Sequence, residues 1–182
     1  MNRVGVLVAL ALASGAAGFL LYVFLVGHDQ ADDGLPPLPP PPQAADYAPE
    51  FSLPDLEGRL RASSEWDGSY RVVNFWATWC PPCIREIPLL VDIQRDYADR
   101  DVHVIGIAID ETDAVLEFAE RFEFNYPVLI GQEEAMEIGH QFLDGFIGLP
   151  FTVFTDRSGR IRHVHTGEVH REEIEAILAD LL

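Results

Sequence analysis

The sequence contains no lysine and only two cysteines among its 182 residues. All twelve basic residues are arginine, and with 30 Asp and Glu the formal net charge is -18. Because so negative a chain repels the phosphate backbone, and no cluster of arginines offsets it, we do not expect nucleic-acid binding. Two cysteines also exclude a small scaffold held together by several disulfides.

Charged residues are absent from residues 4–26, which are predominantly apolar. A helix of this length would cross the hydrocarbon core of a bilayer. Since Arg3 precedes the run and Asp29 follows it, the positive-inside rule predicts a single-pass anchor over residues 1–27, with the rest of the chain outside the cytoplasm. A cleaved signal peptide is the alternative, because small residues such as Ala11 and Ala13 suit a signal peptidase.

The next part of the chain, residues 28–48, contains the run LPPLPPPPQ. Such proline density favours an extended segment, which predicts a semi-rigid linker. Residues 49–182 are long enough to form one globular domain with its own core.

Within this domain the hydrophobic pattern alternates between strand and helix periodicity, which predicts an α/β domain with a mixed sheet and helices on both faces. A short hairpin is expected first, at residues 51–53 and 59–61. We then expect strands at 70–77, 102–109, 126–130, 151–155 and 160–165, and helices at 84–97, 112–124, 133–140 and 170–182.

Both cysteines lie in the segment Trp79-Cys80-Pro81-Pro82-Cys83, between a predicted strand and a predicted helix. A bridge across so short a loop removes little chain entropy, so a redox role explains the pair better than a structural one. The helix N-terminus favours a thiolate at Cys80, whereas Cys83 should be more buried and suited to resolve a mixed disulfide. A zinc half-site or two inert thiols are the alternatives, although a structural zinc site needs four ligands.

The segment NFWATWCPPC, followed by Glu86 and Pro88, resembles the thioredoxin superfamily and specifically its membrane-anchored TlpA/ResA-like thiol-disulfide oxidoreductases. The resemblance implies a thioredoxin fold, with a central mixed β-sheet flanked by helices, an N-terminal hairpin and an inserted helix and strand at about 112–130. It also implies a cis peptide at Pro150 that faces the cysteine pair and directs the Leu149 backbone toward substrate.

Further site residues follow from the same region. Thioredoxin carries a buried Asp six residues before the first cysteine, but this chain has Asn74 there. Glu86 lies one helical turn after Cys83, and our hypothesis is that it accepts the proton of Cys83; a solvent-exposed Glu is the alternative. We expect Trp79, Pro81 and Pro82 to contact substrate, and Trp76 to pack in the core.

These features predict an extracytoplasmic disulfide reductase on a bacterial cytoplasmic membrane, with no cofactor besides the Cys80–Cys83 couple and no metal. The family implies a membrane thiol carrier of the DsbD or CcdA kind as electron donor, and protein clients that include apocytochrome c. One alternative is a peroxiredoxin-like peroxidase, but its Thr would stand three residues before the cysteine, whereas Thr78 stands two before Cys80. The other is a redox-sensing module that binds without turnover.

Overall fold

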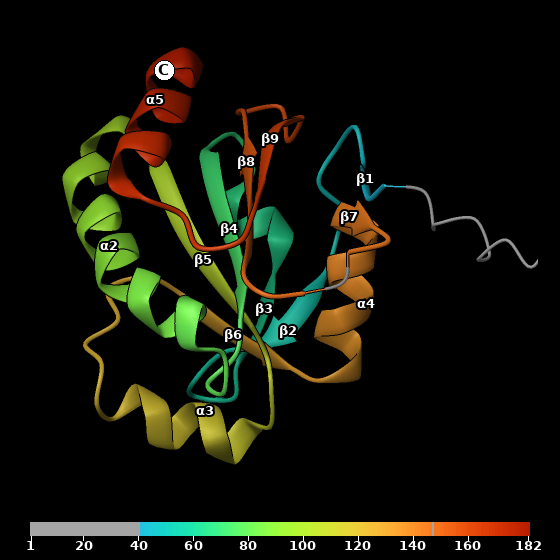
Figure 1. Ribbon diagram of the computed structural model, residues 1–182, viewed down its shortest axis with the longest axis vertical. Helices are drawn as coiled ribbons and strands as arrows, with labels where there is room; N and C mark the ends of the chain where they lie inside the picture. The colour runs from blue at the N-terminus through green and yellow to red at the C-terminus, as the bar shows by residue number, and fades with distance from the viewer. Residues whose placement is uncertain (1–40, 147) are drawn as a thin grey trace, which may run out of the picture. The chain divides into compact units, whose positions relative to one another are not determined.

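A computed structural model describes residues 41–146 and 148–182, and a five-stranded sheet forms their centre (Figure 1). The strand order is β6-β5-β4-β8-β9. Strands β4, β5 and β6 run parallel, while β8 is antiparallel to β4 and β9 is antiparallel to β8. The sheet is therefore mixed, as the sequence predicts. Its strands are β4 (Tyr70–Trp76), β5 (Val102–Ile109), β6 (Val128–Gly131), β8 (Phe151–Thr155) and β9 (Ile161–Thr166).

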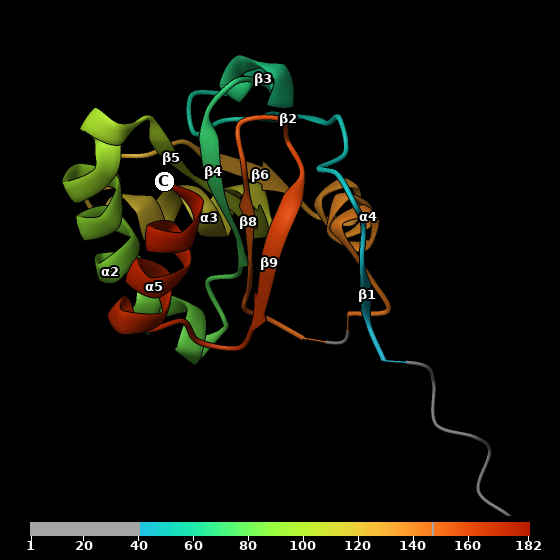
Figure 2. The same cartoon turned by 90° about the horizontal axis from the view of Figure 1, so that it is seen from above.

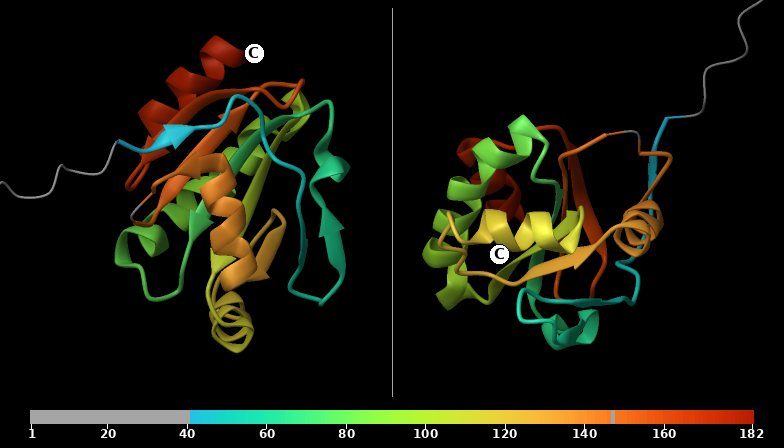
Figure 3. Two further views of the ribbon diagram at one scale, coloured as in Figure 1. Left: turned by 90° about the vertical axis from the view of Figure 1, so that its right-hand side faces the viewer. Right: turned by 90° about the horizontal axis from the view of Figure 1, so that it is seen from below.

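Helices cover both faces of this sheet (Figures 2 and 3). Helices α2 (Pro81–Tyr97) and α5 (Arg171–Leu181) lie on one face, and α4 (Glu133–Phe142) lies on the other. The side chains of β4 and β5 are almost all buried because both faces are covered, which explains their continuous apolar sequences. The predicted thioredoxin-like arrangement is confirmed.

The predicted insertion forms helix α3 (Thr112–Ala119) and the edge strand β6, but its boundaries differ from the expected ones. Helix α3 does not reach residue 124, because Phe122 stacks on Phe118 and Phe124 packs against Trp76 with ring centroids 5.9 Å apart. Strand β6 begins after Pro127 rather than at Tyr126, since proline has no N–H for the sheet ladder. The Pro127 carbonyl instead accepts from the Gly106 N–H.

The predicted hairpin is present as β2 (Ser52–Pro54) and β3 (Leu60–Ala62), and two 3-10 turns follow at Ser63–Trp66 and Ala98–Arg100. A two-stranded pairing of β1 (Gln43–Ala44) with β7 (Leu143–Asp144) has no counterpart in the sequence pattern. The carbonyl of Asp46 accepts from the Ile161 N–H, so residues 43–48 of the expected linker pair with the domain.

The anchor predicted at residues 1–27 and the linker up to residue 40 lie outside the described residues. Among the helices of residues 41–146 and 148–182, none has the length and apolar character needed to cross a membrane.

Candidate active site

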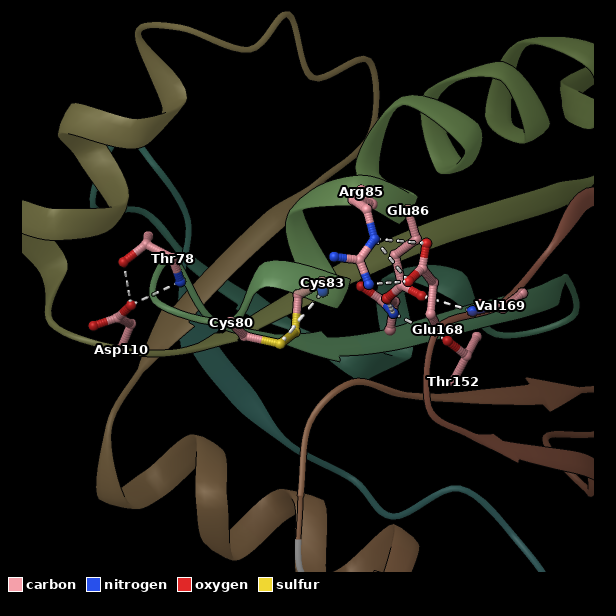
Figure 4. Close-up of a disulfide and its surroundings, with 10 residues drawn as sticks. Thr78, Cys80, Cys83, Arg85, Glu86, Asp110, Thr152, Glu168 and Val169 are labelled. Atoms are coloured by element: carbon pink, nitrogen blue, oxygen red, sulfur yellow. Dashed lines mark hydrogen bonds and ion pairs between the residues drawn. A yellow bond between two sulfur atoms is a disulfide. The ribbon is translucent and has the colours of Figure 1, made fainter.

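The two cysteines form a disulfide at the N-terminal end of α2, with their Cα atoms 5.3 Å apart (Figure 4). Cys80 is the N-cap residue of α2, and its sulfur accepts a hydrogen bond from the Cys83 N–H at 3.3 Å. Pro81 occupies the first helical position, where its missing N–H leaves no partner unsatisfied. The helix therefore directs its positive end at the Cys80 sulfur, as the sequence suggested.

The two cysteines differ in their access to solvent. Cys80 is 4% exposed, whereas Cys83 is completely buried in the apolar cluster between α2 and the sheet. Pro81 is exposed and Pro82 is half-buried, so the segment between the two cysteines reaches the surface. An incoming thiol or disulfide therefore has access to Cys80 and not to Cys83.

Glu86 lies one turn after Cys83 on the buried side of α2 and is 1% exposed. The alternative of a solvent-exposed Glu is therefore wrong. Its Oε1 accepts from Asn74 Nδ2 at 2.7 Å, and its Oε2 accepts from the Val169 N–H at 2.9 Å. Figure 4 shows Glu86, Thr152 and Val169 on one side of the disulfide, and Thr78 with Asp110 on the other.

Burial raises the pKa of the Glu86 carboxyl from 4.5 to about 7, because an ion in an apolar environment loses its hydration. The hydrogen bonds from Val169 and Asn74 favour the ionised form and offset part of this effect, and the nearby Glu168 carboxylate adds to the increase. A carboxyl with a pKa near neutrality can both accept and release a proton under physiological conditions.

Strands β4 and β8 supply the polar partners of this carboxyl. Asn74 and Thr152 are paired in the register of the two strands, and both are buried. Asn74 Nδ2 donates to Thr152 Oγ1 at 3.0 Å as well as to Glu86. Hydrogen-bonded polar side chains thus connect Glu86 on α2 through Asn74 on β4 to Thr152 on β8.

On the other side of the disulfide, Asp110 at the end of β5 holds the strand-to-helix loop. Its Oδ2 accepts from the Thr78 N–H at 2.9 Å and from the Thr78 hydroxyl at 2.6 Å. The neighbouring Trp79 is 67% exposed, in contrast to Trp76, which is buried in the core as predicted. Trp79 lines a groove of about 500 Å³, together with Ile109, Asp110, Glu111, Gln132, Glu133 and Met136.

The Leu149–Pro150 peptide is cis, as the resemblance implied. Leu149 packs against the apolar cluster that contains both cysteines, and Pro150 is buried. A second groove of about 380 Å³ lies beside this peptide and is lined by Pro42, Leu143, Phe146, Gly148, Leu149, Pro150, Thr166 and Gly167. The structure thus packs Leu149 against the cluster that contains the pair and opens a groove along Leu149 and Pro150.

Sequence reasoning missed the roles of Thr152, Asp110 and Val169. Two of them carried a usable signal. Asp110 directly follows a parallel strand, where functional side chains of α/β sheets gather, and Thr152 is a polar residue in an otherwise apolar strand. The contact of Val169 is made by its backbone N–H, which no side-chain pattern reveals.

A thioredoxin-like sheet with a redox-active pair at the N-terminus of a helix defines a thiol-disulfide oxidoreductase. The model of the family described as Redoxin matches residues 43–181, which is most of the chain. The chain therefore belongs to the redoxin family, and it catalyses thiol-disulfide exchange.

Relatives and solved structures agree with this assignment. The chain is 31% identical over 172 residues to the thiol-disulfide oxidoreductase ResA of Bacillus cereus (strain ATCC 10987 / NRS 248), an alignment that covers 94% of this chain and 91% of that protein. It is 33% identical to ResA of Geobacillus thermodenitrificans (strain NG80-2) over 74% of this chain and 75% of that protein. A thioredoxin-family thiol:disulfide interchange protein from Chlorobium tepidum TLS superposes with a TM-score of 0.68 at 30% identity, over 76% of this chain and 97% of the other.

Proposed function

We propose that the chain is a disulfide reductase that acts outside the cytoplasm and is tethered to a bacterial cytoplasmic membrane by residues 4–26. The observation that carries this proposal is the Cys80–Cys83 disulfide at the N-terminus of α2, with the carboxyl of Glu86 buried one turn below it. The polyproline segment before residue 43 would hold the catalytic domain away from the bilayer.

In the reduced protein, the Cys80 thiolate attacks a client disulfide, forms a mixed disulfide and releases one client thiolate. The Cys83 thiol then transfers its proton to the Glu86 carboxylate, and the resulting Cys83 thiolate attacks the Cys80 sulfur. This second exchange releases the other client thiolate and leaves the Cys80–Cys83 disulfide. Two electrons have passed to the client, and the proton that Glu86 now holds balances the charge of one of the two client thiolates.

Burial explains why Cys83 needs a proton acceptor of its own. The thiol is completely buried and has no access to bulk water, so its proton must go to a group within the protein. Glu86 is on the same face of α2, one turn away, and its pKa of about 7 allows it to be ionised before the transfer and protonated after it.

The charges around the pair support the direction of electron flow. Asp110 is bonded to the loop before Cys80, Glu111 lines the Trp79 groove, and Glu86 lies below the pair. Arg85, the first arginine after the pair, is already bound to Glu168. These carboxylates oppose the stabilisation that the helix N-terminus gives to a Cys80 thiolate, and a couple whose reduced form is less stabilised is a stronger reductant.

Client recognition follows from the two grooves. We assign the backbone of Leu149, beside Pro150, to strand-like pairing with an extended client segment, and the exposed ring of Trp79 to an apolar client side chain. Pro81 and Pro82 border the approach to the Cys80 sulfur. Apocytochrome c thiols oxidised to a disulfide are one client class, and a transmembrane thiol carrier of the DsbD or CcdA kind would return electrons to the pair.

The test combines trapping with a redox titration of the full-length protein. Cys83→Ser should accumulate a mixed disulfide with insulin or another disulfide client, whereas Cys80→Ser should form none. The reduction potential of the couple should lie toward the reducing end of the range of roughly -270 to -120 mV. A value at the oxidising end would contradict the reductase role, and peroxide consumption by Cys83→Ser would instead favour a peroxidase.

A further inference from the structure

Asn74 occupies the middle of β4, between Gly106 of β5 and Thr152 of β8. Its side chain is 1% exposed. A buried amide must normally satisfy both its amino group and its carbonyl oxygen. Here the amino group makes both of its hydrogen bonds, to Glu86 Oε1 and to Thr152 Oγ1, but Asn74 Oδ1 accepts none from the residues that the structure describes.

This orientation of the amide suits the ionised form of Glu86, in which both oxygens are acceptors. The Val169 N–H is a donor only, and because the carbonyl oxygen of a carboxylic acid accepts more strongly than its hydroxyl oxygen, this bond favours Oε2 as the carbonyl oxygen. A proton added to Glu86 therefore belongs on Oε1, which faces Asn74 Nδ2 at 2.7 Å. Nδ2 cannot accept that proton, so the new O–H finds no acceptor on Asn74, and the hydroxyl oxygen is a weaker acceptor for Nδ2 than the carboxylate was.

Rotation of the Asn74 amide by half a turn removes this conflict. Its oxygen and nitrogen exchange places, so that Oδ1 accepts from the protonated Glu86. Thr152 can remain a partner in both orientations, because a hydroxyl accepts from an N–H and donates to a carbonyl. The rotation keeps the two hydrogen bonds of Asn74 with Glu86 and Thr152. The atom of Asn74 without a partner is then Nδ2 instead of Oδ1.

We propose that Asn74 is a positioning residue for thiol-disulfide exchange, whose amide donates to the ionised Glu86 and turns to accept from the protonated Glu86. The inference rests on the proton relay through Glu86 in the proposed function. It gives a role to the position at which thioredoxin has an Asp. An amide cannot take up the proton itself, so it stabilises each state of the relay and leaves the proton on Glu86.

Other groups around Glu86 do not offer such a rearrangement. On α2, Cys83 is the proton donor, and the guanidinium of Arg85 is bound to Glu168 from the segment before α5. Burial raises the pKa of the Tyr126 phenol above its ordinary value, and the Glu86 charge raises it further, so Tyr126 remains neutral. Asn74 is left as the partner that can change from donor to acceptor.

The first experiment observes the Asn74 amide by NMR in the full-length protein. At pH 9 its amino protons should show dipolar contacts with the Thr152 side chain, and at pH 5 these contacts should be lost. In Glu86→Gln the Val169 N–H holds the oxygen of the new side chain, so the amino group that the substitution introduces must face Asn74. The turned orientation should then persist at every pH. Unchanged contacts at both pH values and in Glu86→Gln would overturn the proposal.

The second experiment measures the pH midpoint of the Glu86 carboxyl carbon in Asn74→Ala. Loss of the donor to the charged form should raise the midpoint by about one pH unit, which is a tenfold smaller acid dissociation constant for the Glu86 carboxyl. The matched control is Thr155→Ala, which truncates a completely buried β8 residue with no bond to this group. Equal midpoints in the two variants would refute the role. If Asn74→Ala does not fold, the amide measurement in Glu86→Gln decides alone.

Neither readout requires turnover, so failure of the proposed function can be recognised separately. An insulin-reduction rate that is the same in Glu86→Gln as in the unmodified protein would contradict the relay. A fixed amide in the presence of a slowed Glu86→Gln would instead contradict only the role of Asn74.

Discussion

Replacement of Glu86 by Gln should stabilise the oxidised protein at high pH and not at low pH. The folded protein holds the Glu86 proton up to a pKa of about 7, whereas the unfolded chain releases it near 4.5. Between these values the folded state binds more protons, so raising the pH favours unfolding. At about 1.4 kcal/mol per pH unit, the unmodified protein loses about 3 kcal/mol across this window through Glu86 alone.

Gln has nearly the shape of Glu and does not ionise, so Glu86→Gln removes this pH-dependent loss of unfolding free energy. Urea unfolding of both proteins at intervals from pH 4 to pH 8 measures the effect as the difference between their unfolding free energies. That difference should move by about 3 kcal/mol in favour of Glu86→Gln as the pH rises. Glu137→Gln, the same substitution at an exposed position of α4, measures the background. Parallel curves for Glu86→Gln and the unmodified protein would refute a buried carboxyl with a raised pKa.

Two further predictions concern packing and recognition. Trp79→Ala should change the unfolding free energy by no more than about 0.5 kcal/mol, because the ring is 67% exposed, but it should lower the second-order rate of insulin reduction. Stopped-flow kinetics of the two proteins would measure this, and equal rates would contradict a client-binding role. Phe142→Ala should cost about 3–5 kcal/mol in thermal or urea unfolding, because the ring is fully buried against Phe51 and Phe75. A loss below about 1 kcal/mol would show that this side of the sheet is not tightly packed.

The sequence predicted much of the fold because its strongest signals are local. Apolar runs such as 102–109 have a strand pattern that neighbouring residues suffice to define. The predicted end of helix α3 was wrong because the true end depends on aromatic contacts with Trp76, a residue more than forty positions earlier. The pairing of β1 with β7 joins segments about a hundred residues apart, and two-residue strands leave no periodicity to detect.

The difference between local signals and contacts of distant residues also explains which parts of the site could be predicted. Cys80, Cys83 and Glu86 are close in sequence on one helix, so their spacing was sufficient to bring them together. Asn74, Glu86 and Thr152 come from three elements, and Asn74 and Thr152 are 78 positions apart. Only the pairing of the strands and the packing of the helix bring them into contact. From the sequence alone, Asn74 could be described only as a position that lacks the Asp of thioredoxin.

The attachment of Glu86 has a consequence for how this scaffold could diversify. Its carboxyl is held by Asn74 of β4 and by the backbone N–H of Val169, with Thr152 of β8 bonded to Asn74, and neither Trp79 nor Leu149 makes any of these contacts. Substitutions around Trp79 or Leu149 can therefore change which clients bind while the proton chemistry stays as it is. Recognition and proton transfer are separable properties of this domain, and an engineer could exchange the groove residues without retuning the pair.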